Sequence, residues 1–159
     1  MLSAESLKQI DRELAKYPKE QNRSAIMGAL RIAQVELGYL SDETIIYVAE
    51  YVGIPAAQAL EVATFYNMYD LHPVGKHKIT VCTNLPCALR GGMAAGEYLK
   101  AKLGIGFGET TADGKFTLME GECMGACGDA PVLIVNNHKM CSFMTKEAID
   151  QKLAEWSAN

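Results

Sequence analysis

The first part of the chain carries apolar residues at intervals of three and four, the spacing of an amphipathic helix. Ser41 is suited to an N-cap and Gly53 to a helix end, and Pro55 is suited to the first turn of a following helix. Apolar stripes of this kind are typical of the core of a small helical bundle. The predicted helices cover residues 3–17, 23–37, 42–52 and 55–66.

The pattern changes after a loop between Asp70 and Lys78 that contains proline and glycine. We expect a boundary there, between a helical region over residues 1–72 and a second domain over residues 73–159. In the second domain, short β-branched runs alternate with helical segments. This α/β order is that of a thioredoxin-like domain. The predicted elements are strands over 78–82, 115–120, 132–135 and 139–143, a helix over 88–103 and a final helix that begins after Thr145.

Composition and charge narrow the class of protein. The chain is 49% hydrophobic and 21% charged, which is ordinary for a soluble globular protein. Its 15 basic and 19 acidic residues give a net charge of −4, which argues against a nucleic-acid partner. No run approaches the length of a membrane span, so we expect no insertion into a membrane. The N-terminal segment has no apolar stretch of a signal peptide, and a cytoplasmic protein is expected.

The five cysteines are the strongest candidates for chemistry. An odd number argues against a secreted disulfide framework and favours a reducing compartment. Four of them form a C-x4-C pair, Cys82 and Cys87, and a C-x3-C pair, Cys123 and Cys127, separated by 35 residues. Each pair follows a predicted strand, so two loops at one end of a sheet could bring the sulfurs together. Four thiolates are what a [2Fe-2S] cluster needs, two for each iron.

The composition of these loops also suits a cluster. Gly125 and Gly128 allow the positive φ angles with which a loop turns its N–H groups toward sulfur, and Pro86 fixes the chain before Cys87. A structural zinc site is the open alternative, although zinc ribbons favour C-x2-C pairs. The chain has no C-x-x-C motif, which argues against a dithiol oxidoreductase. Cys141 stands alone in a predicted strand, where a cysteine is usually a small buried hydrophobic residue.

Other candidate motifs are weak. The glycine-rich segment 104–108 lacks the spacing of a nucleotide-binding loop and follows a helix, so we interpret it as a plain loop. His72, His77 and His138 share no ligand spacing. The aromatic segment 61–69 indicates either core or an interface with a partner. No catalytic arrangement is recognisable.

With the cysteines in place, the chain resembles the thioredoxin-like [2Fe-2S] subunit of the NADH dehydrogenase module of respiratory complex I (NADH:quinone oxidoreductase). The resemblance implies that the four paired cysteines hold one [2Fe-2S] cluster and that no residue is catalytic. The segments that carry it are Glu61–Tyr66, Pro73–Lys76, the cysteines Cys82, Cys87, Cys123 and Cys127, residues 109–114, and Ala130-Pro131.

The resemblance implies an electron-transfer subunit of an oxidoreductase, without a substrate site of its own. The subunit would pack on the partner that binds NADH and FMN, beside the large iron–sulfur subunit, and its cluster would exchange one electron with FMN. This is the peripheral arm of a complex on the cytoplasmic face of the bacterial inner membrane. Equivalent subunits of NAD-dependent formate dehydrogenases and NAD-reducing hydrogenases are an alternative. A zinc-stabilised interaction module is the alternative from a different class.

Overall fold

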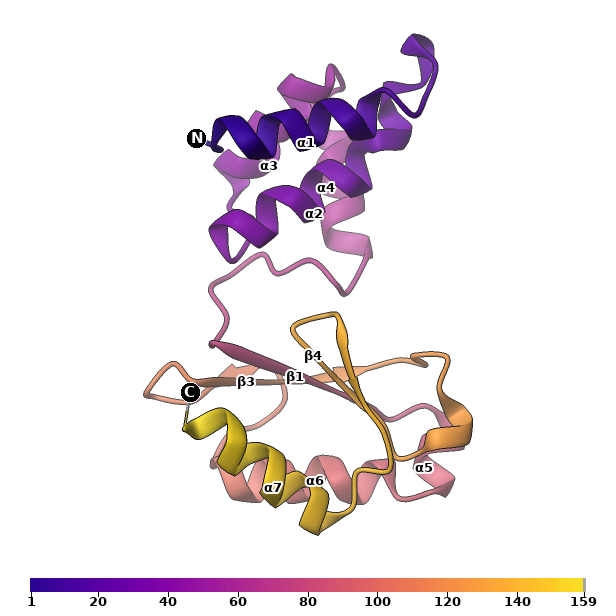
Figure 1. Cartoon of the computed structure of the whole chain (residues 1–159), viewed down its shortest axis with the longest axis vertical. Coiled ribbons are helices and arrows are strands. Elements are labelled where there is room, and N and C mark those ends of the chain that lie inside the picture. The colour runs from indigo at the N-terminus through magenta and orange to yellow at the C-terminus, as the bar shows by residue number, and fades with distance from the viewer. Residues whose placement is uncertain (159) are drawn as a thin grey trace. The chain divides into compact units, whose positions relative to one another are not determined.

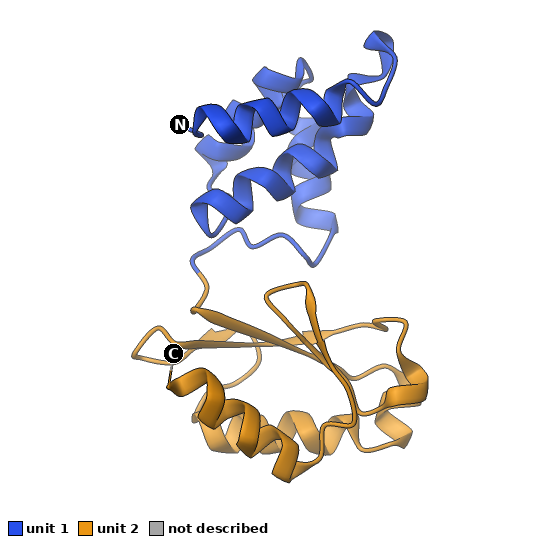
Figure 2. Cartoon of the chain, viewed as in Figure 1, with its two compact units in different colours: residues 1–73 blue, residues 74–159 orange. Residues whose placement is uncertain are grey.

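The computed structural model describes residues 1–158 and divides the chain into two compact units, Met1–Pro73 and Val74–Asn159 (Figure 2). The sequence places this division after residue 72, one residue earlier. Asn159, the last residue of the expected second domain, lies outside the described residues. Each unit has a hydrophobic core of its own.

The first unit is a bundle of helices, with α1 packed on α2, α2 on α3, and α3 on α4 (Figure 1). The Ser41 hydroxyl accepts a hydrogen bond from the Thr44 N–H, and Gly53 ends α3 in the left-handed conformation with φ +81°. Both residues therefore act as the sequence predicts. The elements are α1 (Ala4–Leu14), a 3₁₀ segment η1 (Lys19–Ala25), α2 (Ile26–Leu37), α3 (Asp42–Val52) and α4 (Ala56–Phe65).

Two of the expected helices are too long in the prediction. The first ends at Leu14 instead of residue 17, and the second begins at Ile26 instead of residue 23. The difference at the second helix has a local cause, because residues 19–25 form 3₁₀ turns with a kink at Gln21, where φ is −120°. The core of the bundle is made by the apolar stripes, and its fully buried side chains include Ile10, Leu30, Leu40, Ile45 and Val48.

The second unit is built on a mixed five-stranded sheet in the order β2-β3-β1-β4-β5. β1 and β3 are parallel, and the other neighbours are antiparallel. Asn136 and Asn137 both have positive φ, 51° and 62°, as a tight hairpin turn between β4 and β5 requires. The strands are β1 (His77–Cys82), β2 (Glu109–Thr110), β3 (Phe116–Gly121), β4 (Leu133–Val135) and β5 (Lys139–Cys141).

Two helices cover one face of this sheet, α6 (Gly92–Leu103) and α7 (Lys146–Ser157) (Figure 1). The prediction of one helix over 88–103 is wrong. The chain forms a short helix α5 (Leu85–Leu89) and then α6, because Gly91 adopts a left-handed φ of +96° between them. A final 3₁₀ turn, η2, covers Cys127–Asp129. The core between sheet and helices includes Ile79, Leu99, Leu118, Leu133 and Ile149. The α/β class is confirmed.

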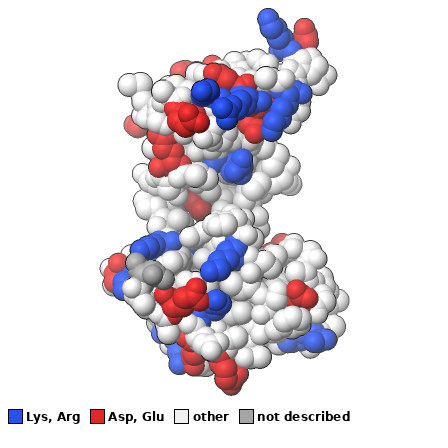
Figure 3. Space-filling view, viewed as in Figure 1, with Lys and Arg blue, Asp and Glu red and all other residues white. Residues whose placement is uncertain are grey.

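On the face shown in Figure 3, acidic and basic side chains are intermixed over both units. Within residues 1–158, no helix has the combination of length and apolar character needed to cross a bilayer.

Candidate iron–sulfur site

The four paired cysteines lie where two parallel strands leave the sheet. Cys82 is the last residue of β1 and pairs in register with Gly121, the last residue of β3. Cys123 follows two residues later, Cys87 is on α5, and Cys127 begins η2. Because β1 and β3 run in the same direction, their ends meet at one edge of the sheet, where Figure 1 shows α5 and the loop after β3. The topology therefore brings the two cysteine loops together.

Within this edge, the sulfurs are arranged as two pairs. The thiol of Cys87 is hydrogen-bonded to that of Cys82. The Sγ atoms of Cys123 and Cys127 are 3.6 Å apart. The pairs are also near each other, because the Cys127 thiol interacts electrostatically with both Cys82 and Cys87.

The two pairs differ in their exposure to solvent. Cys82 and Cys87 are each 1% exposed and pack with Ala130 and Val132 in a small apolar cluster. Cys123 and Cys127 are exposed. A group held by all four sulfurs would therefore have one side in the protein interior and the other at the surface.

At two of the four cysteines, Cys87 and Cys127, the protein alone disfavours the thiolate form. Burial, and then the neighbouring Cys82, raise the pKa of the Cys87 thiol. The hydrogen bond with Cys123, followed by burial, raises the pKa of the Cys127 thiol. Removing four protons here would place four negative charges side by side, which requires a strongly cationic group between them. Two ferric ions bridged by sulfide are such a group.

The arrangement in pairs fits a binuclear cluster. Zinc sites and iron–sulfur clusters both use cysteine thiolates, but they arrange them differently. A tetrahedral zinc ion takes four such ligands at one centre. A [2Fe-2S] cluster instead takes two thiolates at each of two irons, which is the pattern of Cys82 with Cys87 and Cys123 with Cys127.

The backbone of the second loop bends toward its sulfur. Gly125 has φ +75°, and its N–H donates to Cys123 Sγ over 3.4 Å. Such N–H···S bonds stabilise a thiolate ligand. Of the two glycines that allow a positive φ, only Gly125 adopts one, and Gly128 does not. In the first loop, Pro86 lies in the first turn of α5, which carries Cys87.

The structure adds four polar residues that no sequence motif singles out. The Thr83 hydroxyl donates to Glu120 Oε1 over 2.8 Å, and the Asn84 Nδ2 donates to Glu122 Oε2 over 2.7 Å. Thr83 and Asn84 lie between the first two cysteines, and Glu122 directly precedes Cys123. They have no characteristic spacing, so only the folded chain reveals that they meet.

Cys141 is not part of this site. It lies in the core between sheet and helices, near Met144, Ile149 and Trp156, and it is 6% exposed. Burial raises the pKa of its thiol. The interpretation of Cys141 as a packing residue is confirmed.

The histidines have different environments. His72 and His138 are exposed, and the His77 ring stacks on Trp156 with 6.0 Å between ring centroids. In the glycine-rich segment, Gly104 ends α6 with φ +67°. Within the described part of the chain, none of these residues joins the cysteines in a group that could hold a metal ion.

The aromatic segment 61–69 has a double character. Tyr69 is buried and its hydroxyl donates to the Met27 carbonyl oxygen over 2.9 Å, whereas Phe65 is 80% exposed. Phe65 and Tyr66 contact each other edge to face, with 5.0 Å between ring centroids. The segment therefore supplies both core and an exposed aromatic surface.

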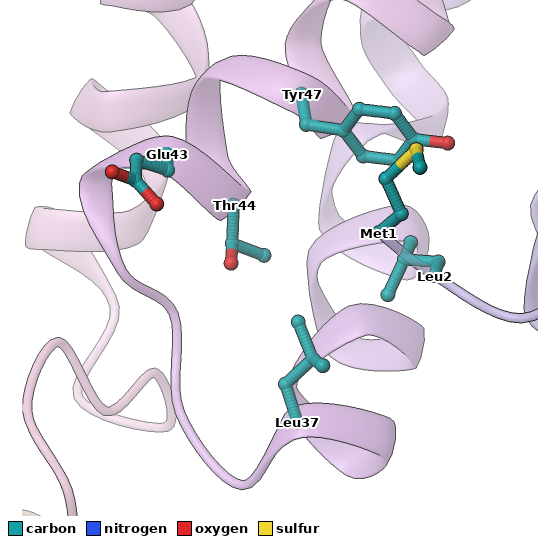
Figure 4. Close-up of a pocket in the computed structure, with 6 residues that line it drawn as sticks. All are labelled: Met1, Leu2, Leu37, Glu43, Thr44 and Tyr47. Carbon is teal, nitrogen blue, oxygen red and sulfur yellow. The ribbon is translucent and has the colours of Figure 1, made fainter.

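A pocket of about 280 Å³ lies in the first unit and not at the cysteines. Figure 4 shows Leu37 and Thr44 projecting toward it from different segments, with Met1 beside the Tyr47 ring. Its lining has no thiol, imidazole or basic side chain, so it offers nothing for redox chemistry. The lining residues are Met1, Leu2, Leu37, Glu43, Thr44 and Tyr47.

Several known proteins are similar to this chain in sequence. NADH-quinone oxidoreductase subunit 2 of Thermus thermophilus is 39% identical over 145 residues, which cover 91% of this chain and 80% of the relative. An NADH-quinone oxidoreductase subunit of Rickettsia prowazekii is 48% identical over 125 residues, 78% of this chain and 71% of the relative. The mitochondrial NADH dehydrogenase [ubiquinone] flavoprotein 2 of Dictyostelium discoideum is 40% identical over 151 residues, 92% of this chain and 61% of the relative.

A solved structure gives the same fold at low sequence identity. The crystal structure of NAD+-reducing [NiFe]-hydrogenase in the H2-reduced state matches with a TM-score of 0.70 and 19% identity, covering 82% of this chain and 22% of that one. This likeness concerns the fold alone.

The family model for the thioredoxin-like [2Fe-2S] ferredoxin matches residues 10–157, nearly the whole chain. The match includes both units and all five cysteines. It agrees with the mixed sheet and with the paired thiols, and it favours an iron–sulfur cluster over the zinc alternative. The chain therefore belongs to the thioredoxin-like [2Fe-2S] ferredoxin family, whose cofactor is a [2Fe-2S] cluster.

Proposed function

We propose that this chain is the electron-transfer [2Fe-2S] subunit of the NADH dehydrogenase module of NADH:quinone oxidoreductase. The observation that carries the proposal is the meeting of two thiol pairs at one edge of the sheet, with one pair buried and one exposed. The relatives named as NADH-quinone oxidoreductase subunits, at 39% and 48% identity, support this choice of complex.

In this proposal, Cys82 and Cys87 hold one iron and Cys123 and Cys127 hold the other. The cluster, when bound, accepts and returns one electron at a time. The chain's part is to keep the four sulfurs in place, to donate the Gly125 N–H to Cys123, and to shield the buried pair from water. No residue of the chain is assigned to a catalytic step.

The electron is exchanged with FMN on the partner subunit that binds NADH. NADH delivers two electrons as a hydride, so a neighbouring centre that takes one electron complements the flavin. The exposed pair, Cys123 and Cys127, gives the shorter path to such a partner than the buried pair does. Around the loops, Leu85, Leu89 and Phe143 are exposed apolar side chains suited to contact with a protein surface.

The helical unit serves as a docking region in this proposal. It contains none of the five cysteines, and a diffusing electron carrier would not need it. Its exposed side chains include Leu60 and Phe65 on α4, at 43% and 80% exposure. The partners are the NADH- and FMN-binding subunit and the adjacent large iron–sulfur subunit. The chain would then lie in the peripheral arm, on the cytoplasmic face of the bacterial inner membrane.

Metal analysis of the purified chain tests the cofactor and its ligands. We expect a red-brown protein with about two irons and two acid-labile sulfides per chain. Serine at any of the four ligand positions should reduce the iron content, whereas Cys141→Ser should not. A colourless protein with one zinc would contradict the proposal.

Co-purification tests the complex. A tagged form of the protein, produced at its natural level, should recover a flavin-containing subunit with NADH dehydrogenase activity and quinone reduction. Recovery of hydrogenase or formate dehydrogenase subunits instead would contradict the assignment to NADH:quinone oxidoreductase. The cofactor would be unaffected by that result, so the two parts of the proposal are tested separately.

A further inference from the structure

The two ligand loops lose their backbone connection just where the cysteines begin. The ladder between β1 and β3 ends at the Cys82–Gly121 pair, and the Thr83 N–H then donates to the Gly121 carbonyl oxygen over 3.2 Å. Beyond this point the two segments separate, one into α5 and the other into the loop before η2. From here on, hydrogen bonds between side chains connect the two segments.

Two hydrogen bonds cross between the loops at this place. Thr83 donates to Glu120 over 2.8 Å, and Asn84 donates to Glu122 over 2.7 Å, from residues that are 37 and 38 positions apart in the sequence. Both acceptors are carboxylates, and hydrogen bonds to an ionised acceptor are stronger and shorter than neutral ones. We call these four residues the loop clasp.

Asn84 gives up a local bond to take part in the loop clasp. It occupies the N-cap position of α5, with φ −63° and ψ 156°, where an asparagine side chain ordinarily accepts from a helix N–H. Its side chain makes no capping hydrogen bond here. Instead its amide donates to the Glu122 carboxylate on the other loop. The side chain thus serves the contact between loops and not the helix that it begins.

We propose that Asn84 and Glu122 are positioning residues for the cluster, which fix the separation between the loop that carries Cys82 and Cys87 and the loop that carries Cys123 and Cys127. The inference rests on the proposed ligand set. Asn84 lies between the first two cysteines, and Glu122 is bonded covalently to Cys123, so the clasp acts within one or a few residues of three ligands. Partners of this kind orient metal ligands and affect how tightly the metal is held.

Glu122 has a second effect that can be separated from the first. Its carboxylate places a negative charge beside the exposed cysteine pair, and a negative charge near a cluster disfavours the reduced form. Glu122→Gln removes the charge but leaves an amide oxygen that can accept from Asn84. Asn84→Ala removes the hydrogen bond but leaves the charge. Asn84→Ala therefore tests the effect of the hydrogen bond on retention of the cluster, and Glu122→Gln tests the effect of the charge on its reduction potential.

The experiment measures two quantities on the full-length protein loaded with its cluster. These are the rate of absorbance loss after addition of an iron chelator and the midpoint potential by EPR-monitored titration. Asn84→Ala should release iron about 10-fold faster, the lower end of the range for residues that orient metal ligands, with only a small change in potential. Glu122→Gln should release iron more slowly than Asn84→Ala, because a weaker neutral hydrogen bond remains, and it should have a raised potential.

A double-mutant comparison shows whether the two residues act as a pair. Asn84→Ala combined with Glu122→Ala should release iron no faster than Glu122→Ala alone, because the bond is already lost. Tyr98→Phe is the matched control, since Tyr98 donates to Asp150 over 2.8 Å at an exposed site away from the loops. It should retain the cluster as the wild type does.

Several results would overturn the inference. Release from Asn84→Ala at the wild-type rate would do so, as would rates in the double variant that equal the product of the single effects. The iron-free Asn84→Ala chain could melt at a lower temperature than the wild type. In that case the comparison of Glu122→Gln with Glu122→Ala tests the inference, because Glu122→Gln should release iron more slowly than Glu122→Ala. Equal rates from these two variants would overturn it. A wild-type chain that binds no cluster would instead contradict the proposed function.

Discussion

Gly92 and Cys82 are in such close contact that a Cβ atom on Gly92 would lie 2.7 Å from the Cys82 carbonyl oxygen. The same atom would lie 2.9 Å from the Cys87 carbonyl oxygen. The first residue of α6 therefore packs directly against the backbone of both buried cysteines, and a side chain there cannot be accommodated without moving them.

Gly92→Ala should consequently weaken the cluster site. We expect a loss of about 1–3 kcal/mol in the free energy of unfolding, the usual cost of overpacking, together with reduced iron content. Urea denaturation and iron analysis would measure both. Gly128→Ala is the matched control, because a Cβ atom on Gly128 would have nothing within 4 Å and its φ is not positive. Equal iron content in the two variants would contradict this prediction.

His77 should make the second unit less stable in mild acid. Burial, and then the charges of Lys76 and Lys139, lower the pKa of its imidazole, against a smaller opposing contribution from the Trp156 backbone. As the pH falls, the His77 imidazole of the unfolded chain is therefore protonated at a higher pH than that of the folded chain. Stability is complete above the ordinary histidine pKa of about 6.5 and falls as the pH drops through it toward the lower pKa of the folded state.

The measurement is the urea midpoint of the iron-free chain at about pH 7.5 and about pH 5.5, on either side of the ordinary pKa. His77→Phe keeps an aromatic ring beside Phe116 and Trp156 and should lose part of the difference between the two values. His138→Gln, at an exposed position, should leave the difference as in the wild type. An unchanged difference in His77→Phe would rule out this origin of the pH dependence.

Cys141→Ala should affect stability without affecting the cluster. The side chain is buried beside Met144, and the loss of its sulfur atom should cost about 1 kcal/mol in the free energy of unfolding. Iron and sulfide contents should equal those of the wild type. Loss of iron from this variant would show that Cys141 takes part in holding the cluster.

The two cores should respond separately to truncation. Leu30 is fully buried in the helical unit and Leu118 in the sheet unit. Each change to alanine should cost about 2–5 kcal/mol in the unit that contains it. Iron should be lost from Leu118→Ala and retained by Leu30→Ala, as measured by iron content and by proteolysis of each unit. Equal loss from both variants would contradict separate cores.

Much of the fold can be predicted from local sequence, where a single residue determines the backbone. Ser41 caps α3 and Gly53 ends it, and the asparagine pair at 136–137 makes a tight turn. The break between α5 and α6 could not be predicted, because the helical spacing continues across Gly91 and a glycine within such a pattern is ambiguous. The two-residue strand β2 is exposed and too short to show alternation.

The same division holds for the site. The proposed sulfur ligands can be picked out in the sequence because few residue types bind iron and the spacing of the four cysteines is distinctive. The bond between Asn84 and Glu122 is not, since both are common polar residues and they meet only because β1 and β3 end together. Gly125 adopts the positive φ that glycine allows and Gly128 does not, and nothing in their neighbouring residues distinguishes the two.

The parallel pairing of β1 and β3 has a consequence for how the protein matures. Parallel neighbours cannot be joined by a tight turn, so the chain must complete α5, α6 and β2 before the second cysteine pair reaches the first. An unfinished chain thus holds at most half of the ligands. The cluster should therefore bind only after β1 and β3 have paired. Once bound, it should stabilise the folded unit against unfolding, so a subunit that contains iron is also one that has folded correctly.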